Sequence, residues 1–514
     1  MRRAARPLLA LAAGLAQAAS IASPFAAWGG GAPLWWLQLL SLALLAGLLD
    51  DCAGSARRGA RLGLAFAVAW LAGVFWWLFI SMHTYGGLAA PLAAAAVLAL
   101  ALGLALYYAA AAAWYARCAP RLGPAARAAL FAAAWLLAEL ARGRWFTGFP
   151  WGAAGYAHVQ GPLAGLAPWV GAYGVGAVAA FLAVALAGAA RRGAGRRGAL
   201  LALAGACAVL ALPPLWRPWD APAHDAGTLS VALLQGNIPQ DEKFQPGSGV
   251  PLALQWYGEQ LREARAQLVV APETALPLLP LQLPDGYWDA LRGHFGQGAQ
   301  AALVGVPLGS LRAGYTNSVA GLAPGQAAPY RYDKHHLVPF GEFVPPLFRW
   351  FTDLMDIPLG DFNRGAVGQP SFAWGGQRLA PNVCYEDLFG EELAARFTDP
   401  AQAPTVFVNV SNIGWFGDSV AIDQHLQISR MRTLEFARPM LRATNTGATA
   451  IIDHRGAVAA ALPRLTRGVL EGEVQGRTGT TPYAWWAARF GLAPLWLLGL
   501  AIAATGGFRR PWAA

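Results

Sequence analysis

The stretch RLAPNVCYEDLFG, residues 378–390, places a cysteine between a predicted strand and a predicted helix. The strand runs over 378–385, and a helical pattern follows over 386–397. Alternating strands and helices are typical of layered α/β domains. Cys384 stands at the junction beside Tyr385 and two carboxylates. The stretch therefore predicts an α/β domain and singles out one thiol.

The same alternation extends to both sides of this stretch. Several runs are continuously apolar, as expected for strands that are covered on both faces. The helical pattern over 419–437 predicts a buried face from Leu426 to Leu434, with Arg430 and Arg432 on other faces. Further strands are predicted at 229–235, 266–272, 301–306, 315–322, 403–410, 440–446 and 448–453, and further helices at 250–265 and 285–296.

The composition separates this α/β region from the rest of the chain. Only 13% of the 514 residues are charged and 56% are hydrophobic, whereas about 25% charged residues is usual. Charge is dense from 218 to 480 and sparse on either side. We therefore predict a transmembrane bundle over 1–217, a domain over 218–480 that is long enough for one large core, and a last transmembrane helix over 481–514.

About eight transmembrane helices are predicted in the sparse regions, because a spanning helix needs about 20 mostly apolar residues. The fifth of them is short and ends near Glu139. The spans are predicted at 7–27, 34–50, 62–82, 90–115, 128–141, 163–189, 198–214 and 485–507.

The arginines predict the orientation of these spans, since Lys and Arg accumulate on cytoplasmic loops. With the N-terminus inside, fifteen arginines flank the inner ends and only Arg142 and Arg144 lie in short outer loops. This places 218–480 outside the cytoplasm and explains the net charge of +10 better than nucleic-acid binding does. Residues 1–20 could instead be a cleaved signal peptide, which leaves the remaining topology unchanged.

Three short stretches that follow predicted strands carry reactive side chains. Glu273 follows one strand, Lys334 follows another with Glu342 eight residues on, and Cys384 ends a third. A thiol attacks as its thiolate, a carboxylate can take its proton, and a lysine can stabilise the anion. Lys334 and the backbone N–H of Tyr385 could hold the oxyanion. The set is sufficient for acyl transfer.

Structural roles for the same residues stay open at this stage. Glu273 could cap a helix, and Glu342 could be an ion-pair partner only. A metal site at His335 and His336 is disfavoured, because adjacent side chains on an extended chain point to opposite sides. The aromatic loop 145–156 is either an interfacial belt or the wall of a lipid cavity. The apolar stretch 345–359 is either a core-covering loop or a lid that dips into lipid.

Seven motifs together resemble the bacterial apolipoprotein N-acyltransferases, which are membrane-embedded members of the nitrilase superfamily. The resemblance covers essentially the full length and implies an extracytoplasmic αββα sandwich between spans. The motifs are QGNIPQ (235–240), PETALP (272–277), YDKHHLVPFGEFVP (332–345), NVCYEDLFG (382–390), NVSNIGWFGDS (409–419), QHLQISRMR (424–432) and RATNTG (442–447).

The resemblance implies a role for each matched residue. Glu273 would be the general base, Lys334 would support the oxyanion, and Cys384 would form a thioester. Glu342 matches the second glutamate near the lysine, while Tyr385 and Glu386 match supporting positions. The chain departs from the pattern at two positions: Phe244 stands where the family often has Trp, and Ile413 stands where an acidic residue is common, so no role is assigned to Ile413.

The implied reaction transfers an acyl chain from a phospholipid, through Cys384, to the N-terminal amine of a diacylglyceryl-cysteine lipoprotein. It would take place at the outer face of the bacterial inner membrane, without cofactor, metal or nucleic acid. A membrane-anchored nitrilase or amidase acting on small C–N substrates is one alternative. A non-catalytic lipid-binding or transport protein is another. Head group, acyl position and oligomeric state are left open.

Overall fold

The computed structural model describes residues 5–52, 54–190, 224–345, 348–349 and 361–508. The predicted seventh span, 198–214, and residues 346–347 and 350–359 of the apolar stretch lie outside these ranges. The chain divides into two compact units. The first comprises Met1–Phe79, Ala90–Trp219 and Phe490–Ala514, and the second comprises Ile80–Ala89 and Asp220–Arg489.

The first unit is built from apolar helices. In its described part, four helices are long and apolar enough to cross a membrane. A bent pair of helices over Pro482–Gly506 would raise this number to five for the whole described chain if the pair forms one span. Two shorter apolar helices, α1 and α2, precede them. The helices are α1 (Ala5–Ile21), α2 (Trp35–Asp50), α3 (Ala56–Phe75), α5 (Ala90–Cys118), α6 (Pro124–Arg144), α7 (Ala167–Ala190) and α15 (Ala493–Phe508).

Helix α6 differs from the short fifth span that the sequence predicts. It has 21 residues and continues beyond Glu139 to include Arg142 and Arg144, which were expected in an outer loop. Arg142 is buried and donates hydrogen bonds to the carbonyl oxygens of Phe149 and Trp151, each at 2.7 Å. The helix tolerates this charge because Nη1 bonds to both backbone oxygens and Nε donates to the Tyr108 hydroxyl at 2.9 Å, so most of the buried guanidinium is paired inside the unit.

Small residues bring α3 and α5 into close contact. A Cβ atom added to Gly59 would lie 2.5 Å from the Cβ of Ala116, and one added to Gly63 would lie 2.4 Å from the Cβ of Ala112. Gly and Ala spaced four apart let two helix backbones approach closely, which is how apolar helices associate where burial of apolar surface supplies no driving force.

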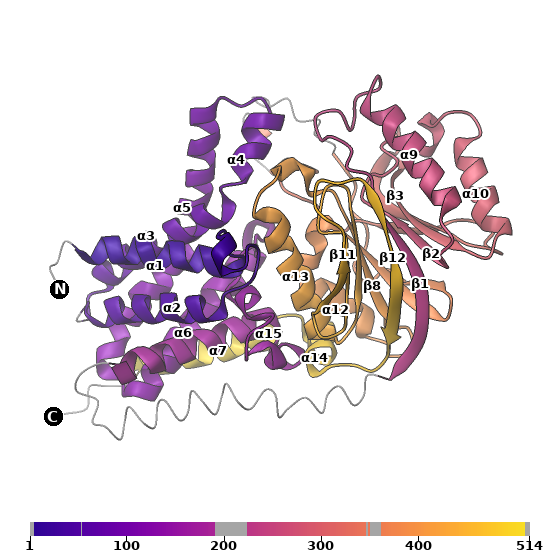
Figure 1. The fold of residues 1–514 in the computed structure, drawn as a ribbon. Helices are drawn as coiled ribbons and strands as arrows, with labels where there is room; N and C mark the ends of the chain where they lie inside the picture. The colour runs from indigo at the N-terminus through magenta and orange to yellow at the C-terminus, as the bar shows by residue number, and fades with distance from the viewer. Residues whose placement is uncertain (1–4, 53, 191–223, 346–347, 350–360, 509–514) are drawn as a thin grey trace. The chain divides into compact units, whose positions relative to one another are not determined.

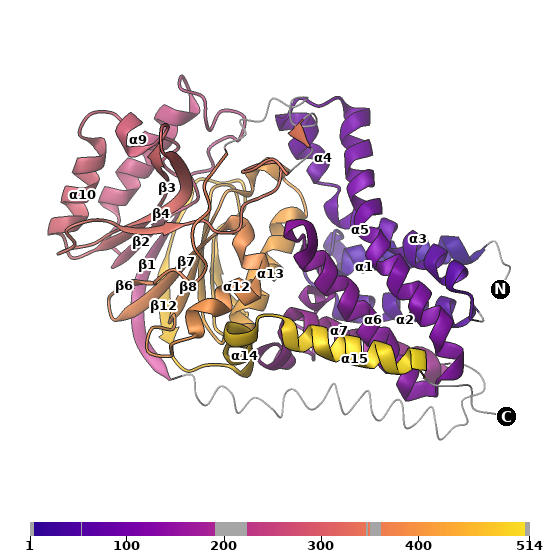
Figure 2. The same ribbon diagram turned by 180° about the vertical axis from the view of Figure 1, so that it is seen from behind.

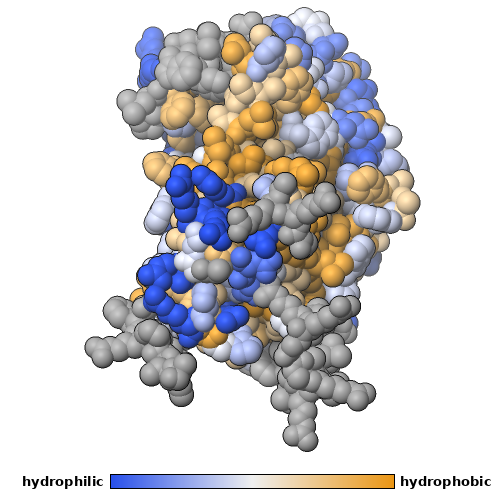
Figure 3. Space-filling view, turned by 90° about the vertical axis from the view of Figure 1, so that its left-hand side faces the viewer, coloured by the Kyte–Doolittle hydropathy of each residue, from blue (hydrophilic) through white to orange (hydrophobic). Residues whose placement is uncertain are grey.

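The same packing brings arginines together at one end of this helix pair. Arg57 and Arg58 are exposed at the start of α3, and Arg117 is exposed in the last turn of α5. In Figure 3, hydrophilic residues gather at the lower left and along the upper right edge of the face, with broad apolar areas between them. An apolar surface with localised charge is typical of a membrane protein.

The second unit contains two six-stranded sheets. Their strand orders are β12-β1-β2-β3-β4-β5 and β11-β10-β9-β8-β7-β6. The strands are β1 (Asp225–Gln235), β2 (Leu268–Ala271), β3 (Ala301–Ser310), β4 (Gly314–Leu322), β5 (Tyr330–Asp333), β6 (Phe372–Trp374), β7 (Gln377–Val383), β8 (Val406–Ser411), β9 (Met440–Thr444), β10 (Ala450–Ile452), β11 (Val458–Ala461) and β12 (Gly468–Arg477).

Alternate side chains of the central strands enter different cores. Val231 and Leu233 of β1 join Val408 and Leu441 of the other sheet in one core, whereas Leu234 of β1 packs with residues of α9 and α10. Successive side chains of a strand point to opposite faces, so strands buried on both faces need continuous apolar sequence. The apolar runs had indicated such strands.

Helices cover the outer face of each sheet (Figures 1 and 2). Helices α9 (Gly249–Glu263) and α10 (Tyr287–Gln297) cover the first sheet, and α12 (Gly390–Ala394) and α13 (Ala421–Phe436) cover the second. The predicted αββα sandwich is therefore confirmed.

Two helical predictions were wrong in detail. The pattern over 386–397 forms three short turns rather than one helix, because 3₁₀ turns at Cys384–Leu388 and Ala395–Phe397 flank α12. Helix α13 is buried on nearly all sides, Arg430 and Arg432 included. Arg432 pairs with Glu435 at 3.0 Å and Arg430 donates to the carbonyl of Gly456 at 2.6 Å, so each guanidinium has a partner inside the protein.

A ten-residue segment of the N-terminal half belongs to the second unit. The third span was predicted to reach residue 82, but α3 ends at Phe75 and Ile80–Ala89 is part of the second unit. Tyr85 meets the ring of Trp415 edge-on, with the ring centroids 5.9 Å apart. Trp415 lies in the turn Ile413–Phe416, directly after β8.

Candidate active site

Three strands of the sandwich end at the predicted catalytic residues. Glu273 follows β2 by two residues, Lys334 directly follows β5, and Cys384 directly follows β7. Strand ends of a rigid sheet hold reactive side chains more precisely than long loops do. The sequence had placed each of these residues at the end of a strand, and the structure does so too.

The two glutamates and the lysine form one buried cluster. Lys334 Nζ lies 2.8 Å from Glu342 Oε1 and 3.4 Å from Glu273 Oε1. All three side chains are almost completely buried. Although burial opposes it, the carboxylates of Glu342 and Glu273 hold the pKa of Lys334 above its usual value. The lysine is therefore a permanent positive charge in this cluster.

Asn317 is a member of this cluster that the sequence analysis missed. Its Nδ2 donates to Oε1 of Glu273 and to Oε1 of Glu342, at 2.7 Å each. Asn317 is buried in the middle of β4. In the sequence, the only indication of its role was an amide side chain inside a predicted strand. Together with the backbone N–H of Asn412, which donates to Glu273 Oε2 at 2.8 Å, Asn317 fixes the orientation of the Glu273 carboxylate.

Cys384 occupies a strained turn between β7 and the following 3₁₀ turn. Its φ angle is 52°, in the left-handed region that L residues rarely adopt. Its carbonyl oxygen lies 3.2 Å from Asn409 Nδ2 and 3.2 Å from His425 Nε2. Non-glycine residues held in this region cluster at functional sites, where the surrounding structure maintains the strain.

The thiol is neutral in the resting site. Burial and the nearby Glu273 carboxylate raise the pKa of Cys384 to about 12, and Lys334 opposes this rise. A free cysteine has a pKa of about 8.5. A base must therefore remove the proton before the sulfur can attack, and Glu273 is the carboxylate whose charge acts most strongly on the thiol.

Glu386 ties the cysteine strand to the lysine strand. Its carboxylate accepts hydrogen bonds from the backbone N–H of Val383 at 2.7 Å, from the N–H of His335 at 2.6 Å, and from the Tyr332 hydroxyl at 2.8 Å. Burial raises the pKa of Glu386, while these donors lower it. Because Val383 precedes Cys384 and His335 follows Lys334, Glu386 acts as a positioning residue.

A second buried network contacts the turn at Cys384. Asp387 Oδ1 lies 2.9 Å from His425 Nε2, and Asp387 Oδ2 lies 3.6 Å from Arg442 Nη1. Burial opposes it, but His425 and Arg442 hold the pKa of Asp387 below its usual value. The charges keep His425 beside the Cys384 carbonyl and so support the turn that presents the sulfur.

Tyr385, His335 and His336 each contact neighbouring residues of the second unit. Tyr385 packs edge-on against Phe389, with centroids 5.3 Å apart. His336 Nδ1 lies 2.9 Å from Glu392 Oε1, and His335 Nδ1 lies 2.7 Å from the Gly365 carbonyl oxygen. Within the described residues, no group of three or more His, Cys, Asp or Glu side chains is placed to hold a metal ion.

Lys243 is a second buried lysine at the site, and it was also missed. Its Nζ donates to the backbone oxygen of Glu273 at 3.0 Å. Burial lowers the pKa of Lys243 to about 7, against the charges of Glu273 and Cys384. The surrounding run QDEKFQ looks like a solvated turn in the sequence, and nothing in its pattern distinguishes this buried amine from its exposed neighbours.

Phe244 follows Lys243 and lies at the edge of the site. It is 37% exposed and its ring stacks on Trp415 with centroids 6.5 Å apart. Tyr85, Trp415 and Phe244 thus form a continuous aromatic row. The row provides an apolar border next to the Glu273 loop.

Two family models match the chain. The model of the apolipoprotein N-acyltransferase N-terminal domain matches residues 13–185, and the carbon–nitrogen hydrolase model matches residues 230–483. The first match falls on the apolar helices, and the second falls on the two-sheet unit that carries the site.

Curated relatives match over nearly the whole chain. An apolipoprotein N-acyltransferase of Verminephrobacter eiseniae is 65% identical over 508 residues, which cover 94% of this chain and 92% of the relative. Another of Ralstonia nicotianae is 48% identical, covering 90% of this chain and 86% of the relative. Among solved structures, a carbon–nitrogen hydrolase from Helicobacter pylori is 15% identical and covers 48% of this chain and 89% of that chain, with a TM-score of 0.35.

Proposed function

The chain belongs to the apolipoprotein N-acyltransferase family and is a membrane N-acyltransferase, and from this premise we propose that Cys384 carries the acyl group between a phospholipid and a diacylglyceryl lipoprotein. The observation that carries the proposal is the convergence of Glu273, Lys334 and Cys384 at three strand ends. A carboxylate, a fixed ammonium and a thiol are what a two-step acyl transfer needs.

In the first step, the Glu273 carboxylate takes the proton from Cys384 Sγ. The thiolate attacks an ester carbonyl of the phospholipid, and Lys334 with the Tyr385 N–H stabilises the oxyanion. The intermediate collapses by breaking the C–O bond to the glycerol oxygen. That oxygen takes the proton from Glu273 and leaves as a lysophospholipid, with the acyl chain held as a thioester.

In the second step, the α-amine of the acceptor's lipidated cysteine attacks the thioester carbonyl. Glu273 takes a proton from the amine, and the C–S bond breaks to leave the acceptor as an amide. The departing sulfur regains the proton from Glu273, which restores the resting site. The permanent charge on Lys334 stabilises the oxyanion of both steps.

We also propose where the enzyme works. The arginine distribution supports a site on the extracytoplasmic side of the inner membrane, within a domain over 218–480, followed by a last span within 481–514. Acyl chains partition into lipid with about 0.8 kcal/mol for each buried CH₂. A lipid setting therefore concentrates both substrates and limits hydrolysis of the thioester by water.

Trapping the intermediate tests the proposal. The full chain in phospholipid nanodiscs is incubated with an acyl-labelled phospholipid, and we expect a hydroxylamine-sensitive label on Cys384 that a diacylglyceryl lipopeptide removes. The Cys384→Ala variant should form no labelled enzyme and no triacylated product. Normal product formation by this variant would overturn the assignment. Cys118→Ala, which alters a buried cysteine of the first unit, is the matched control.

A further inference from the structure

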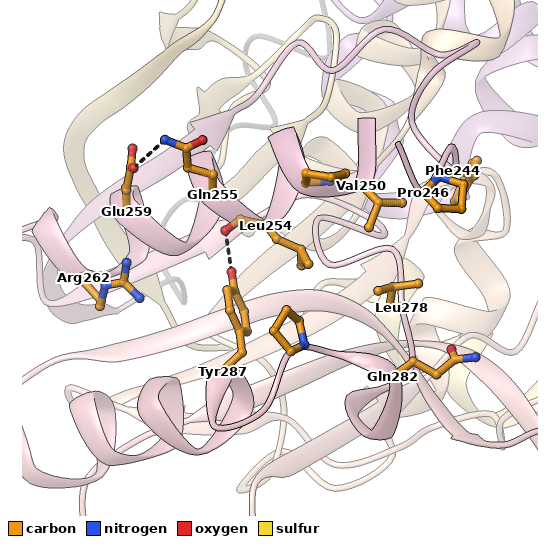
Figure 4. A pocket seen from close by; sticks show the side chains of 12 residues that line it. Phe244, Pro246, Val250, Leu254, Gln255, Glu259, Arg262, Leu278, Gln282 and Tyr287 are labelled. Carbon is orange, nitrogen blue, oxygen red and sulfur yellow. Dashed lines mark hydrogen bonds between the residues drawn. The ribbon is translucent and has the colours of Figure 1, made fainter. Parts of the chain in front are cut away.

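A groove runs along α9 on the side that faces the loop 278–287 (Figure 4). Its volume is about 640 Å³, within the usual range for ligand sites of about 300–1,000 Å³. One wall is formed by Phe244, Val250 and Leu254, and the other by Leu278, Pro284 and Tyr287. The Tyr287 hydroxyl donates to the Leu254 carbonyl oxygen at 2.6 Å and ties the two walls together.

Both walls begin at the loops that hold the proposed general base. The α9 wall starts at Phe244, whose neighbour Lys243 donates to the backbone of Glu273. The opposite wall reaches Leu278 five residues after Glu273. One end of the groove is therefore lined by residues of the two loops that carry Lys243 and Glu273.

The far end of the groove is polar. Gln255 lies in the middle of α9, whereas Glu259 and Arg262 lie on its last turns, and the Gln255 Nε2 donates to Glu259 Oε1 at 3.1 Å. Helix α9 has 15 residues, which corresponds to about 22 Å at 1.5 Å per residue. About six or seven residues of an extended chain would span this length at ~3.3 Å per residue.

We propose that this groove binds the polypeptide that follows the lipidated cysteine of the acceptor, in an extended conformation that leads away from Cys384. The inference rests on the proposed function and adds where the protein part of the acceptor lies. The apolar walls near Phe244 fit side chains, and the amide and charged groups at the far end can bond to peptide N–H and C=O groups. A hydrocarbon chain is disfavoured there, because it would desolvate the charged groups of Glu259 and Arg262 and offer them no polar contact in return.

Acceptors of different peptide length test the proposal. The full chain in nanodiscs is given diacylglyceryl-cysteine amide or diacylglyceryl peptides of two, four and eight residues. We expect kcat/KM to rise with length up to about six residues and then to level off. Gln255→Trp, at an exposed position that lines the groove, should raise the KM of the eight-residue acceptor about tenfold and leave the single-residue acceptor unaffected.

Two comparisons separate the possible causes. Glu263→Trp alters an exposed residue of α9 that does not line the groove, and we expect wild-type kinetics with every acceptor. The inference is overturned if the kcat/KM of the wild type does not depend on peptide length, or if Gln255→Trp impairs transfer to all acceptors equally. It is also overturned if Gln255→Trp slows thioester formation by an amount that depends on the chain length of the acyl donor. The last result would assign the groove to hydrocarbon. Absence of transfer to every acceptor by the wild type would instead contradict the proposed function.

Discussion

Lys334 Nζ lies 2.8 Å from Oε1 of Glu342, closer than the 3.4 Å that separates it from Glu273. The lysine therefore has its shorter ion pair with Glu342, which transfers no proton in the proposed mechanism. In that mechanism, Glu342 holds the ammonium in place while Glu273 gains and loses a proton. Of the two glutamates, Glu342 also has the larger effect in raising the pKa of Lys334.

Glu342→Gln should slow thioester formation about 10- to 100-fold without abolishing it. The amide keeps the size of the side chain but removes the charge that fixes Lys334, so the oxyanion is stabilised less well. Single-turnover labelling with an acyl-labelled phospholipid measures the rate. Glu392→Gln is the control, since Glu392 contacts His336 in the same region. A Glu342→Gln rate equal to that of the control would show that Glu342 is a structural partner only.

The pH dependence of Cys384 alkylation should reflect its raised pKa of about 12. Because the thiol is protonated well above neutral pH, its alkylation rate without substrate should still be rising at pH 9 to 10. An ordinary thiol would level off above its pKa of about 8.5. Iodoacetamide labelling followed by mass spectrometry measures it, with Cys384→Ala as background. A plateau by about pH 8 would contradict the prediction.

Glu273→Gln should have opposite effects on alkylation and on catalysis. The Glu273 charge raises the pKa of Cys384, so its removal should lower that pKa and speed alkylation at pH 8. The same change removes the general base, and acyl transfer should fall by at least about 100-fold. Both rates are measured on one preparation in nanodiscs. A parallel loss of both would indicate a disrupted site.

Asn317→Leu should reduce turnover about 100-fold in folded protein. Leucine has a similar size but cannot donate to Glu273 and Glu342, so both carboxylates lose a fixed partner at 2.7 Å. Steady-state acyl transfer per mole of folded enzyme measures the effect. Ser318→Ala removes the neighbouring buried hydroxyl, which bonds to Asp333 instead, and should keep near wild-type turnover. Equal losses in both variants would point to general damage of β4.

Gly59→Ala should destabilise the first unit by about 1–3 kcal/mol. The new Cβ would meet the Ala116 Cβ at 2.5 Å and the Ala112 backbone oxygen at 2.7 Å, so α3 and α5 must move apart. Gly103→Ala is the matched control in α5, because no atom lies within 4 Å of its added Cβ. Thermal unfolding in detergent should show a lower Tm for the first variant alone. Equal Tm values would show that the helices adjust freely.

The sequence allowed much of the sandwich and part of the site to be predicted. Continuous apolar runs identified β1, β3 and β8, and reactive side chains after such runs identified Glu273, Lys334 and Cys384 as candidates. Strands β6, β11 and β12 were missed. β11 is largely exposed, and glycines and glutamates interrupt the alternation of β12.

Long-range contacts explain the rest of what could not be predicted. Lys243 lies beside exposed Asp241 and Glu242 in the sequence, and only the fold buries its amine against the Glu273 backbone. Asn317 needs both glutamates near it before its role is visible. The arginines of α13 were expected outside the core because helical periodicity does not show which polar side chains will find buried partners.

The segment Ile80–Ala89 has a consequence for the order in which the protein is made. Tyr85 emerges from the ribosome 330 residues before its ring partner Trp415, a delay of about 17–66 s at 5–20 residues per second. During that interval residues 80–89 are already synthesised, but the part of the second unit that they contact is not. A fragment that starts near residue 220 would lack this segment, so Trp415 would lose its edge-on contact with Tyr85.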